Sequence, residues 1–408
     1  MSGATGEAAP AANGGSGAVK ETTRDTVRRF IQGDLASLRV VIGLAVIWII
    51  FQSQNDRFLS AENLTNLMLQ ITAVGLISIG IVFVLLLGEI DLSVGAVSGL
   101  AAAVMAVLNA QHGWNPYLAI AAGIAVGLAI GALQGFLFSR FGVPSFVVTL
   151  AGLLAWQGAL LQVLGSTGSI NLTDPKITGL ANTFYSDAVG WTMAVIVIVA
   201  YGALTLAGHR RRLAANLESE GMITLAMRFG LVAVATIVVV AVLNSDRGVP
   251  LALLILVAFV VGMEYVAKQT RFGRHVFAVG GNVEAARRAG IGIEKIRVIV
   301  FALSGTMAAI GGIMAASRLL AVNQNSGGSE LLLLAIAGPV IAGTSLFGGR
   351  GAVWTALVGA LVIGSISNGM DLLALSSAVK FMVTGGVLLL AVIVDAIARR
   401  QRQAAGRV

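Results

Sequence analysis

Cysteine is absent from the 408 residues of this chain, histidine occurs three times, and only 11% of the residues are charged. The lack of cysteine excludes disulfide bonds, thiolate catalysis and cysteine-ligated metal. The three histidines lie far apart in predicted loops, so we expect no histidine-based metal or catalytic centre. A soluble globular domain has about 25% charged residues. A chain with 11% charged and 57% hydrophobic residues therefore belongs in a membrane.

Nucleotide-binding motifs are missing as well. The chain contains neither a G-x-x-x-x-G-K-[ST] loop nor a strand-based dinucleotide motif, and Gly348-Gly349-Arg350-Gly351 lacks the lysine and the spacing of a phosphate loop. We interpret that stretch as a tight cytoplasmic turn. No Ser-His, H-E-x-x-H or paired-aspartate arrangement occurs in the apolar runs, so an intramembrane enzyme is not expected. The chain should bind no cofactor and hydrolyse no ATP itself.

Long apolar runs dominate the sequence instead. A membrane span needs about 20 apolar residues, which predicts an all-α polytopic membrane protein with about 12 spans (roughly 10 to 14). The runs lie near 38–53, 66–88, 92–109, 118–138, 144–165, 189–208, 227–244, 250–267, 297–316, 331–347, 351–368 and 379–398. A polar break between the second and third runs, around Gly88 to Gly95, predicts a broken helix.

Lysine and arginine are distributed unevenly between the two sides of these spans. If the N-terminal tail is cytoplasmic, 22 of the 27 basic residues fall inside and five outside, namely Arg57, Lys176, Arg247, Arg318 and Lys380. This positive-inside bias explains the net charge of +8 without nucleic acid and puts both termini in the cytoplasm. We divide the chain into a disordered, basic cytoplasmic tail (1–36), a transmembrane domain (37–400) and a cytoplasmic tail (401–408).

The longest charged segment between two spans, 268–297, is cytoplasmic by this topology. Within it, Asn282 can cap a short helix from Val283 to Ala289, and Gly290 can adopt the left-handed conformation that ends it. Glu284 lies near the positive end of that helix and Arg287 near its negative end. The segment therefore predicts one rigid helix facing the cytoplasm.

The same segment resembles the coupling loop of importer permeases that dock onto an ATP-binding-cassette (ABC) ATPase. Its order is Glu284-Ala285-Ala286, three residues, then Gly290, although the leucine-proline that ends the motif in many importers is missing. The resemblance extends to RFGRH (271–275), AVGGN (278–282), GEIDLSVGAV (88–97), VPSFVVTLAGLLAW (143–156), AGTSLFGGRGAV (342–353) and SNGMDLL (367–373). Together these motifs are similar to the ribose, xylose and arabinose branch of the branched-chain amino acid and ribose permease family. The spans near 189–208 and 227–244, with the basic loop between them, look like an insertion of xylose-type members.

This resemblance implies a sugar importer subunit, with a pentose such as xylose as its cargo. The implied partners are a cytoplasmic ATPase that uses ATP and Mg²⁺, an external sugar-binding protein and a second copy of the chain, in a bacterial inner membrane. The residues implied in ATPase coupling are Gly280, Gly281, Asn282, Glu284, Ala285, Ala286, Arg287 and Gly290.

Carboxylates inside an apolar stretch mark candidate transport residues, because a charge at the bilayer centre costs about 2.5 to 3.5 kcal/mol. Glu89 and Asp91 interrupt such a stretch, and Asp91 with Ser93 can alternatively cap the helix that follows. Sugar recognition also needs amides or carboxylates that read hydroxyl groups. Candidates of that kind are Gln70, Glu89, Gln134, Gln157, Asn323, Gln324, Glu330 and Asn368. From these we assign Glu89, Asp91, Ser93, Asn323, Glu330 and Asn368 to the translocation pathway.

The rival hypothesis is an ion-coupled secondary sugar transporter in which Glu89 and Asp91 carry a proton or sodium ion. The cytoplasmic coupling segment disfavours it, since such a transporter has no ATPase to dock.

Overall fold

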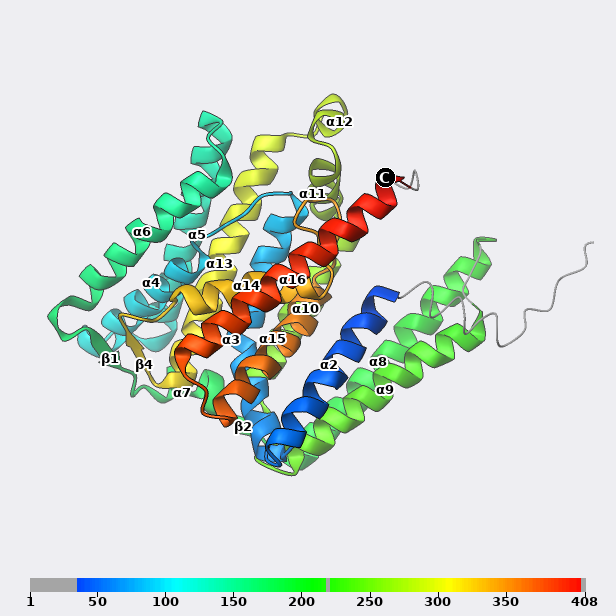
Figure 1. The fold of residues 1–408 in the computed structure, drawn as a ribbon, viewed down its shortest axis with the longest axis horizontal. Coiled ribbons are helices and arrows are strands. Elements are labelled where there is room, and N and C mark those ends of the chain that lie inside the picture. Colours follow the sequence, from blue (N-terminus) through cyan, green and yellow to red (C-terminus); the bar gives the residue numbers. More distant parts are fainter. Residues whose placement is uncertain (1–34, 218–220, 405–408) are drawn as a thin grey trace, which may run out of the picture.

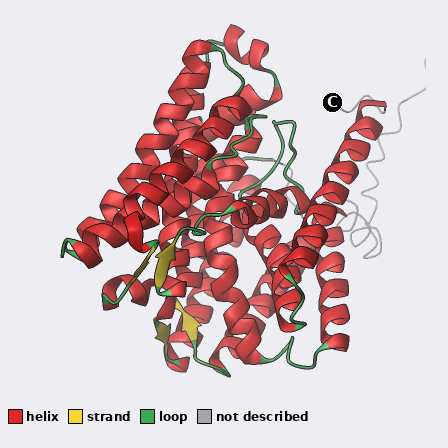
Figure 2. Cartoon of the chain, turned by 60° about the vertical axis from the view of Figure 1, so that its left-hand side comes forward, coloured by secondary structure: helices red, strands yellow, loops and turns green. Residues whose placement is uncertain are grey.

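The computed structural model describes residues 35–217 and 221–404, and these fold almost entirely into helices (Figure 1 and Figure 2). In the first half these are α2 (Leu35–Gln54), α3 (Ala61–Leu86), α4 (Val94–Ala106) with a π-helical last turn (Val107–Gln111), α5 (Pro116–Phe141), α6 (Ser145–Leu164), α7 (Pro175–Asn182) and α8 (Asp187–Ala214). The second half has α9 (Met222–Asn244), α10 (Leu251–Gln269), α11 (Arg271–Gly281), α12 (Val283–Arg288), α13 (Ile293–Leu319), α14 (Ser329–Ile341), α15 (Trp354–Leu372) and α16 (Ser377–Ala404). The predicted all-α class is confirmed.

Among the described residues, nine helices are long and apolar enough to cross a membrane, and three shorter apolar helices accompany them. Each of the twelve predicted runs falls on one of these helices. The run near 331–347 extends too far, because α14 ends at Ile341. Beyond it Gly343, Gly348 and Gly349 adopt positive φ values, a conformation that glycine tolerates and a helix does not.

The predicted tails lie largely outside the described residues. Of the tail 1–36, only the last two positions are described, and they start α2. Of the tail 401–408, residues 401–404 continue α16 and the rest lie beyond the description.

The centre of the bundle is formed by α3 and α13. Every residue of α3 from Ile71 to Leu86 is buried, and α13 packs against α3, α4 and α5. α5 carries a glycine at every fourth position from 123 to 135. A Cβ added at Gly127 would lie 2.3 Å from the carbonyl oxygen of Gly305 on α13, so the two backbones touch. Small residues of this spacing allow close helix packing in lipid.

Two short antiparallel ladders close one end of the bundle, opposite the end that carries α12 (Figure 1). β1 (Ser169–Asn171) pairs with β4 (Ala321–Asn323), and β2 (Phe184–Tyr185) pairs with β3 (Val249–Pro250). The long connection from α6 to α8 thus contains β1, α7 and β2. We call this the ladder end and the opposite one the α12 end.

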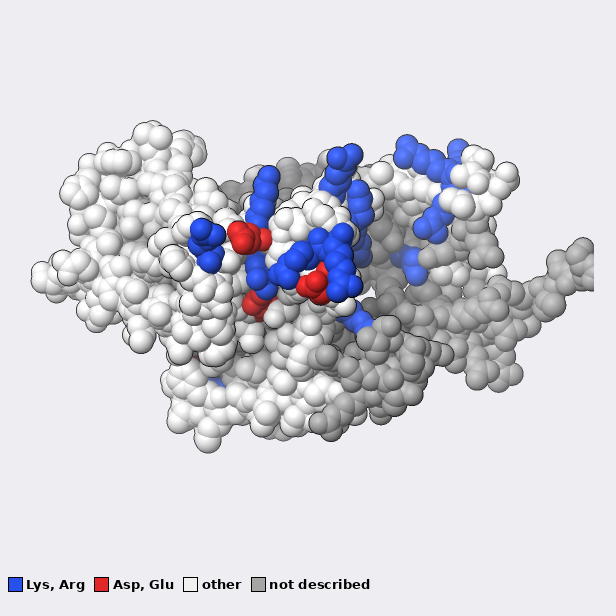
Figure 3. Space-filling model, turned by 90° about the horizontal axis from the view of Figure 1, so that it is seen from above, with Lys and Arg blue, Asp and Glu red and all other residues white. Residues whose placement is uncertain are grey.

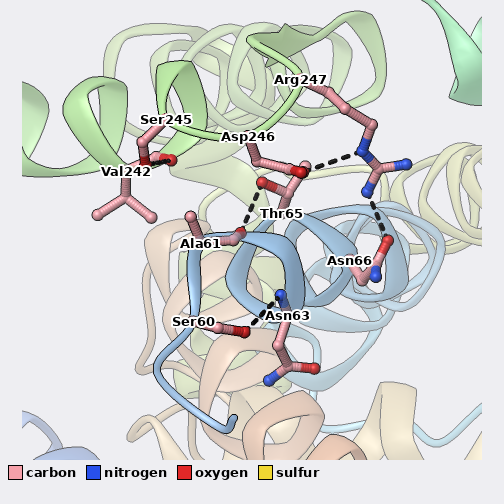
Figure 4. A network of polar contacts seen from close by, with 9 residues as sticks. All are labelled: Ser60, Ala61, Asn63, Thr65, Asn66, Val242, Ser245, Asp246 and Arg247. Carbon is pink, nitrogen blue, oxygen red and sulfur yellow. Dashed lines mark hydrogen bonds and ion pairs between the residues drawn. The ribbon is translucent and has the colours of Figure 1, made fainter.

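A helical hairpin of α8 and α9 lies at the edge of the bundle, where α9 contacts α3. Arg247, just after α9, fixes this contact (Figure 4). Its guanidinium contacts Asp246 at 2.9 Å, donates to Asn66 Oδ1 at 2.6 Å and lies 4.7 Å from the centre of the Phe184 ring. The hairpin is therefore anchored to the start of α3 at the ladder end.

Candidate functional site

The charged segment 268–297 contains two helices, whereas the sequence predicted one. α11 begins after Thr270, whose hydroxyl accepts a hydrogen bond from the Gly273 N–H, and it buries Val276 and Val279 against the bundle. Its three glycines lower intrinsic helix propensity, which is why the sequence did not reveal it; tertiary packing of the apolar face stabilises it instead. The ends of the segment belong to α10 and α13.

The second helix, α12, has the predicted capping geometry. Asn282 Oδ1 accepts a hydrogen bond from the Ala285 N–H at 2.9 Å, and Gly290 has a φ of +79° two residues after the last helical residue. Ala286 is buried against the bundle, while Ala285 faces outward. Asn282 and Gly290 therefore mark the start and the end of a short helix whose outer side is free.

The exposed side of α12 carries charge. Glu284 accepts from Arg287 Nη1 at 3.0 Å and lies 3.4 Å from Arg288 Nε, with side-chain exposures between 56% and 81%. Ion pairs this exposed contribute little to stability. Their main effect is to hold the charged side chains in fixed positions on the surface of α12. Viewed from the α12 end, lysine and arginine side chains gather on this face of the molecule (Figure 3). The face is suited to docking a partner with an acidic rim.

Behind α12, three chain segments meet through glycines. A Cβ added at Gly280, near the end of α11, would lie 1.7 Å from the Leu86 carbonyl oxygen and 2.9 Å from the Gly349 nitrogen. The Gly349 N–H donates to that same Leu86 oxygen at 2.9 Å. We call this contact between the end of α3, the end of α11 and the loop after α14 the glycine junction. Because no side chain separates the segments, a displacement of one must move the others.

Glu89 lies in the break between α3 and α4, next to this junction. Its Oε1 accepts from Arg297 Nη2 at 2.9 Å, with side-chain exposures of 17% and 26%. The Arg297 guanidinium also lies 5.1 Å from the centre of the Phe138 ring. Arg297 stands in the second turn of α13, directly after α12, so the pair links the helix break to the coupling segment.

Asp91 and Ser93 are buried inside the bundle. Asp91 Oδ1 accepts from the Ser93 N–H at 2.9 Å and Oδ2 from the Ser304 hydroxyl at 3.0 Å. The Ser93 hydroxyl lies 2.7 Å from Asp91 Oδ1 and 3.0 Å from Gln134 Oε1. The break between α3 and α4 is also held by Thr149, which accepts from the Leu92 N–H. This network ties the turn before α4 to α5, α6 and α13. Ser93, the N-cap residue of α4, makes no side-chain hydrogen bond to the first turn of that helix, so the capping role considered for Asp91 and Ser93 is not observed.

A cavity of about 330 Å³ opens near the ladder end, between α3, α4, α13, α14 and α15. We call it the outer cavity. Its apolar wall includes Ile71, Val74, Ala102 and Leu334. The polar residues that line it are Gln70, Arg318, Asn325, Ser326, Glu330, Ser367 and Asp371. Its volume is at the lower end of ligand pockets, which measure about 300 to 1,000 Å³.

Asn368 lies beneath this cavity without lining it. It exchanges two amide hydrogen bonds with Asn63, at 2.8 and 3.0 Å, and donates to Gln70 Oε1 at 3.4 Å. Both asparagines are buried. The pair therefore positions Gln70, whose side chain does reach the cavity.

The six residues assigned to the pathway are not brought together. Glu89, Asp91 and Ser93 lie toward the α12 end, Glu330 lines the outer cavity, and Asn323 is in β4, opposite Ser169. Within the described part of the chain, no cluster of three or more His, Asp or Glu side chains could hold a metal ion.

Sequence reasoning missed Arg318, Asp371 and Ser367 as cavity residues. Arg318 carried a signal, since it was one of five basic residues placed outside, at the end of an apolar run. Asp371 lay inside the motif SNGMDLL without being singled out. Nothing in the sequence indicated that the ends of two distant spans share one cavity.

Comparison with known proteins identifies the family. The family described as "Branched-chain amino acid transport system / permease component" matches residues 63–392. The xylose transport system permease protein of Escherichia coli is 36% identical over 363 residues, covering 89% of this chain and 92% of that protein. The corresponding protein of Haemophilus influenzae is 36% identical over 357 residues, covering 87% and 95%.

A second group of relatives is named for ribose. The ribose import permease protein of Escherichia coli is 31% identical over 368 residues, covering 90% of this chain and 96% of that protein. No solved structure matches the chain. The family match and these identities show that the chain belongs to this family of transport-system permease components.

Proposed function

We propose that this member of the permease family is the membrane-spanning subunit of an ABC importer for a pentose, with xylose the first candidate. Relatives named for xylose and ribose import support the substrate class, because they align with almost the whole chain. The observation that carries the coupling role is α12, a capped helix with an exposed charged side, held by α11 against the glycine junction. Gly280, Gly281, Asn282, Glu284, Ala285, Ala286, Arg287 and Gly290 form this coupling element.

The partner ATPase docks on α12 and its charged face, and uses ATP and Mg²⁺ that this chain does not bind. Closure of the ATPases displaces α12. The displacement passes through the short connection to α13 and through the glycine junction to α3. Because α13 also lines the outer cavity, one rigid helix connects the site of ATP hydrolysis to the site where the sugar enters.

In this proposal two copies of the chain form the translocation pathway in a bacterial inner membrane, with α12 and both termini in the cytoplasm. The sugar-binding protein docks at the ladder end. The positive-inside distribution supports this orientation, since the predicted topology assigns 22 of the 27 basic residues to the side that carries the segment 268–297.

An ion-coupled secondary transporter fits the same carboxylates less well. Glu89 is already paired with Arg297, and Asp91 receives hydrogen bonds from Ser93 and Ser304. Two carboxylates that are already satisfied by fixed partners offer a poor binding site for a coupling cation.

The test of the function is transport in proteoliposomes. The chain reconstituted with its ATPase and sugar-binding protein should accumulate D-xylose only when ATP is supplied. Uptake by this chain alone, driven by a proton or sodium gradient, would contradict an ABC importer and favour the rival.

Topology can be tested separately, because the chain has no cysteine. Single cysteines introduced at Ser169, in β1, and at Gly292, just before α13, should react with an impermeant maleimide from opposite sides of the membrane. Labelling of both from the same side would contradict the predicted topology, and α12 could then not be assigned to the cytoplasm, where the ATPase docks.

A further inference from the structure

We infer that the outer cavity is a binding site for the sugar in the permease itself, with Arg318, Glu330 and Asp371 as its hydroxyl-reading groups. This inference rests on the proposed function and goes beyond it, since an importer of this kind can rely on its external binding protein for recognition.

The charged groups of the cavity have unused hydrogen-bonding capacity. The side chains of Arg318 and Glu330 form no hydrogen bond or ion pair with any residue in the described ranges 35–217 and 221–404. Asp371 uses one oxygen, Oδ1, to accept from Lys380 and keeps the other. The half-buried Arg318 guanidinium is attracted by the charge of Asp371 but donates to no acceptor among the described residues, which is costly unless a ligand or water satisfies its five donors. The cavity is thus built to receive polar atoms.

The combination of groups suits a neutral polyol. A carboxylate only accepts hydrogen bonds and a guanidinium only donates them, whereas every sugar hydroxyl does both. Glu330 and the free oxygen of Asp371 can each accept from hydroxyls, and Arg318 can donate to hydroxyl or ring oxygens. The charges of two basic side chains, Arg318 and Lys380, balance those of the two carboxylates. The site is therefore close to neutral and favours a neutral ligand.

The remaining lining supports this assignment. Gln70, positioned by Asn368, adds an amide, and Ser367 adds a hydroxyl, both from helices that end at the ladder end. Ile71, Val74 and Ala102 supply a smooth apolar wall on which the carbon face of a sugar ring can pack. Beside this wall the lining places charged and amide groups, with which the aliphatic side chain of a leucine or isoleucine ligand cannot form hydrogen bonds.

The location connects recognition with coupling. Arg318, near one end of α13, and Arg297, near the other, are 21 residues apart, or about 32 Å along the helix. Arg297 holds Glu89 next to the glycine junction. A sugar bound by Arg318 therefore contacts the same rigid helix that the ATPase moves through α12.

The experiment compares cavity variants with matched controls in the complete importer. Glu330→Gln and Arg318→Gln each remove one charged hydrogen-bonding group from the cavity. The controls are Asp56→Asn and Arg57→Gln, exposed residues of the turn between α2 and α3 that do not line the cavity. At saturating sugar-loaded binding protein, each cavity variant should transport roughly tenfold less D-xylose per ATP hydrolysed, because charged hydrogen bonds are lost. The controls should match the unchanged chain.

Two readouts distinguish recognition from a structural role. Co-purification of the ATPase should be retained in the cavity variants, which shows that they fold and assemble, and the ratio of D-xylose to D-ribose uptake should shift. Unchanged xylose transport per ATP together with an unchanged sugar ratio would overturn the inference.

A second measurement separates this inference from the proposed function. The unmodified chain in lipid nanodiscs, without partners, should give saturation-transfer NMR signals to D-xylose that Glu330→Gln weakens, and none to L-leucine. Signals to leucine alone, or xylose signals insensitive to the variant, would refute the sugar site even if ATP-driven uptake succeeds. Failure of ATP-driven uptake by the unmodified importer would refute the proposed function. The nanodisc measurement would still show whether the outer cavity binds D-xylose.

Discussion

The two ends of the molecule are built differently. At the α12 end, backbones touch through Gly280, Gly349 and Leu86, and the partly buried Glu89 and the buried Asp91 have fixed partners. At the ladder end, the Arg318 and Glu330 side chains in the outer cavity form no hydrogen bond with any described residue, and Asp371 is held only by Lys380. A contact that transmits a displacement must be rigid. A site that receives and releases a hydrated ligand must leave polar groups unsatisfied.

This contrast predicts that substitutions at the α12 end change stability and coupling, whereas substitutions in the outer cavity change transport with little effect on stability. The free energy of unfolding in mixed micelles, together with binding of the partner ATPase, tests this contrast.

The largest effect should come from Gly280→Val. The added Cβ would lie 1.7 Å from the Leu86 carbonyl oxygen, so the glycine junction must open. We expect a loss of about 3 kcal/mol in unfolding free energy, measured by denaturant titration. The neighbouring Gly281 has no atom within 4 Å of an added Cβ and provides the control. Equal losses for Gly280→Val and Gly281→Val would show that the junction is not rigid.

The next effect should come from Asn368→Leu, beneath the outer cavity. It leaves the buried Asn63 Oδ1 without its donor, which costs about 1 to 3 kcal/mol, while Asn63 Nδ2 still donates to the Phe58 carbonyl. Replacing both asparagines with leucine should cost less than the sum of the two single changes, because the double variant leaves neither amide buried opposite an apolar side chain. A strictly additive double mutant would show that the two amides do not depend on each other.

Breaking the ion pair by Glu89→Gln should cost about 1 to 2 kcal/mol, between the values for an exposed and a buried pair. It should also raise ATP hydrolysis in the absence of sugar, because α13 loses its attachment to the helix break. The charge-reversed double variant, Glu89→Arg with Arg297→Glu, should recover most of the loss. The control Glu284→Gln breaks an exposed pair and should change stability by less than about 0.5 kcal/mol.

The smallest effect on stability should come from Gly290→Leu, about 1 kcal/mol for a side chain at a φ of +79°. Its effect on ATPase co-purification should be larger, because α12 loses its terminating turn. Gly292→Leu, at an ordinary φ of −74°, is the control. Wild-type co-purification for both Gly290→Leu and Glu284→Lys would mean that α12 is only a connector.

Much of the α12 end could be predicted from the sequence because its signals are local. Asn282 and Gly290 mark the start and the end of α12, and Glu284 lies one turn from Arg287 and Arg288. The break after α3 was visible as a polar interruption of an apolar run. α11 was missed, since its stability comes from packing that its glycine-rich sequence does not reveal.

The ladder end was less predictable because its groups come together only in the tertiary structure and leave no local signal in the sequence. The polar residues of the outer cavity come from four helices and a loop, and each is unremarkable in its own segment. Asn323 was selected for its amide and lies in β4, whereas Arg318 was left among the outside charges. The structure alone groups Arg318 with Glu330 and Asp371.

The sequence by itself determined the membrane class, the order of the apolar helices and the capped helix α12, since these depend on composition, periodicity and short-range capping. The tertiary structure decided which polar groups are paired. Glu89 meets Arg297 across 208 positions, and Asp91 meets Ser304 across 213. No local pattern encodes such contacts, because they exist only after α13 has packed into the centre of the bundle.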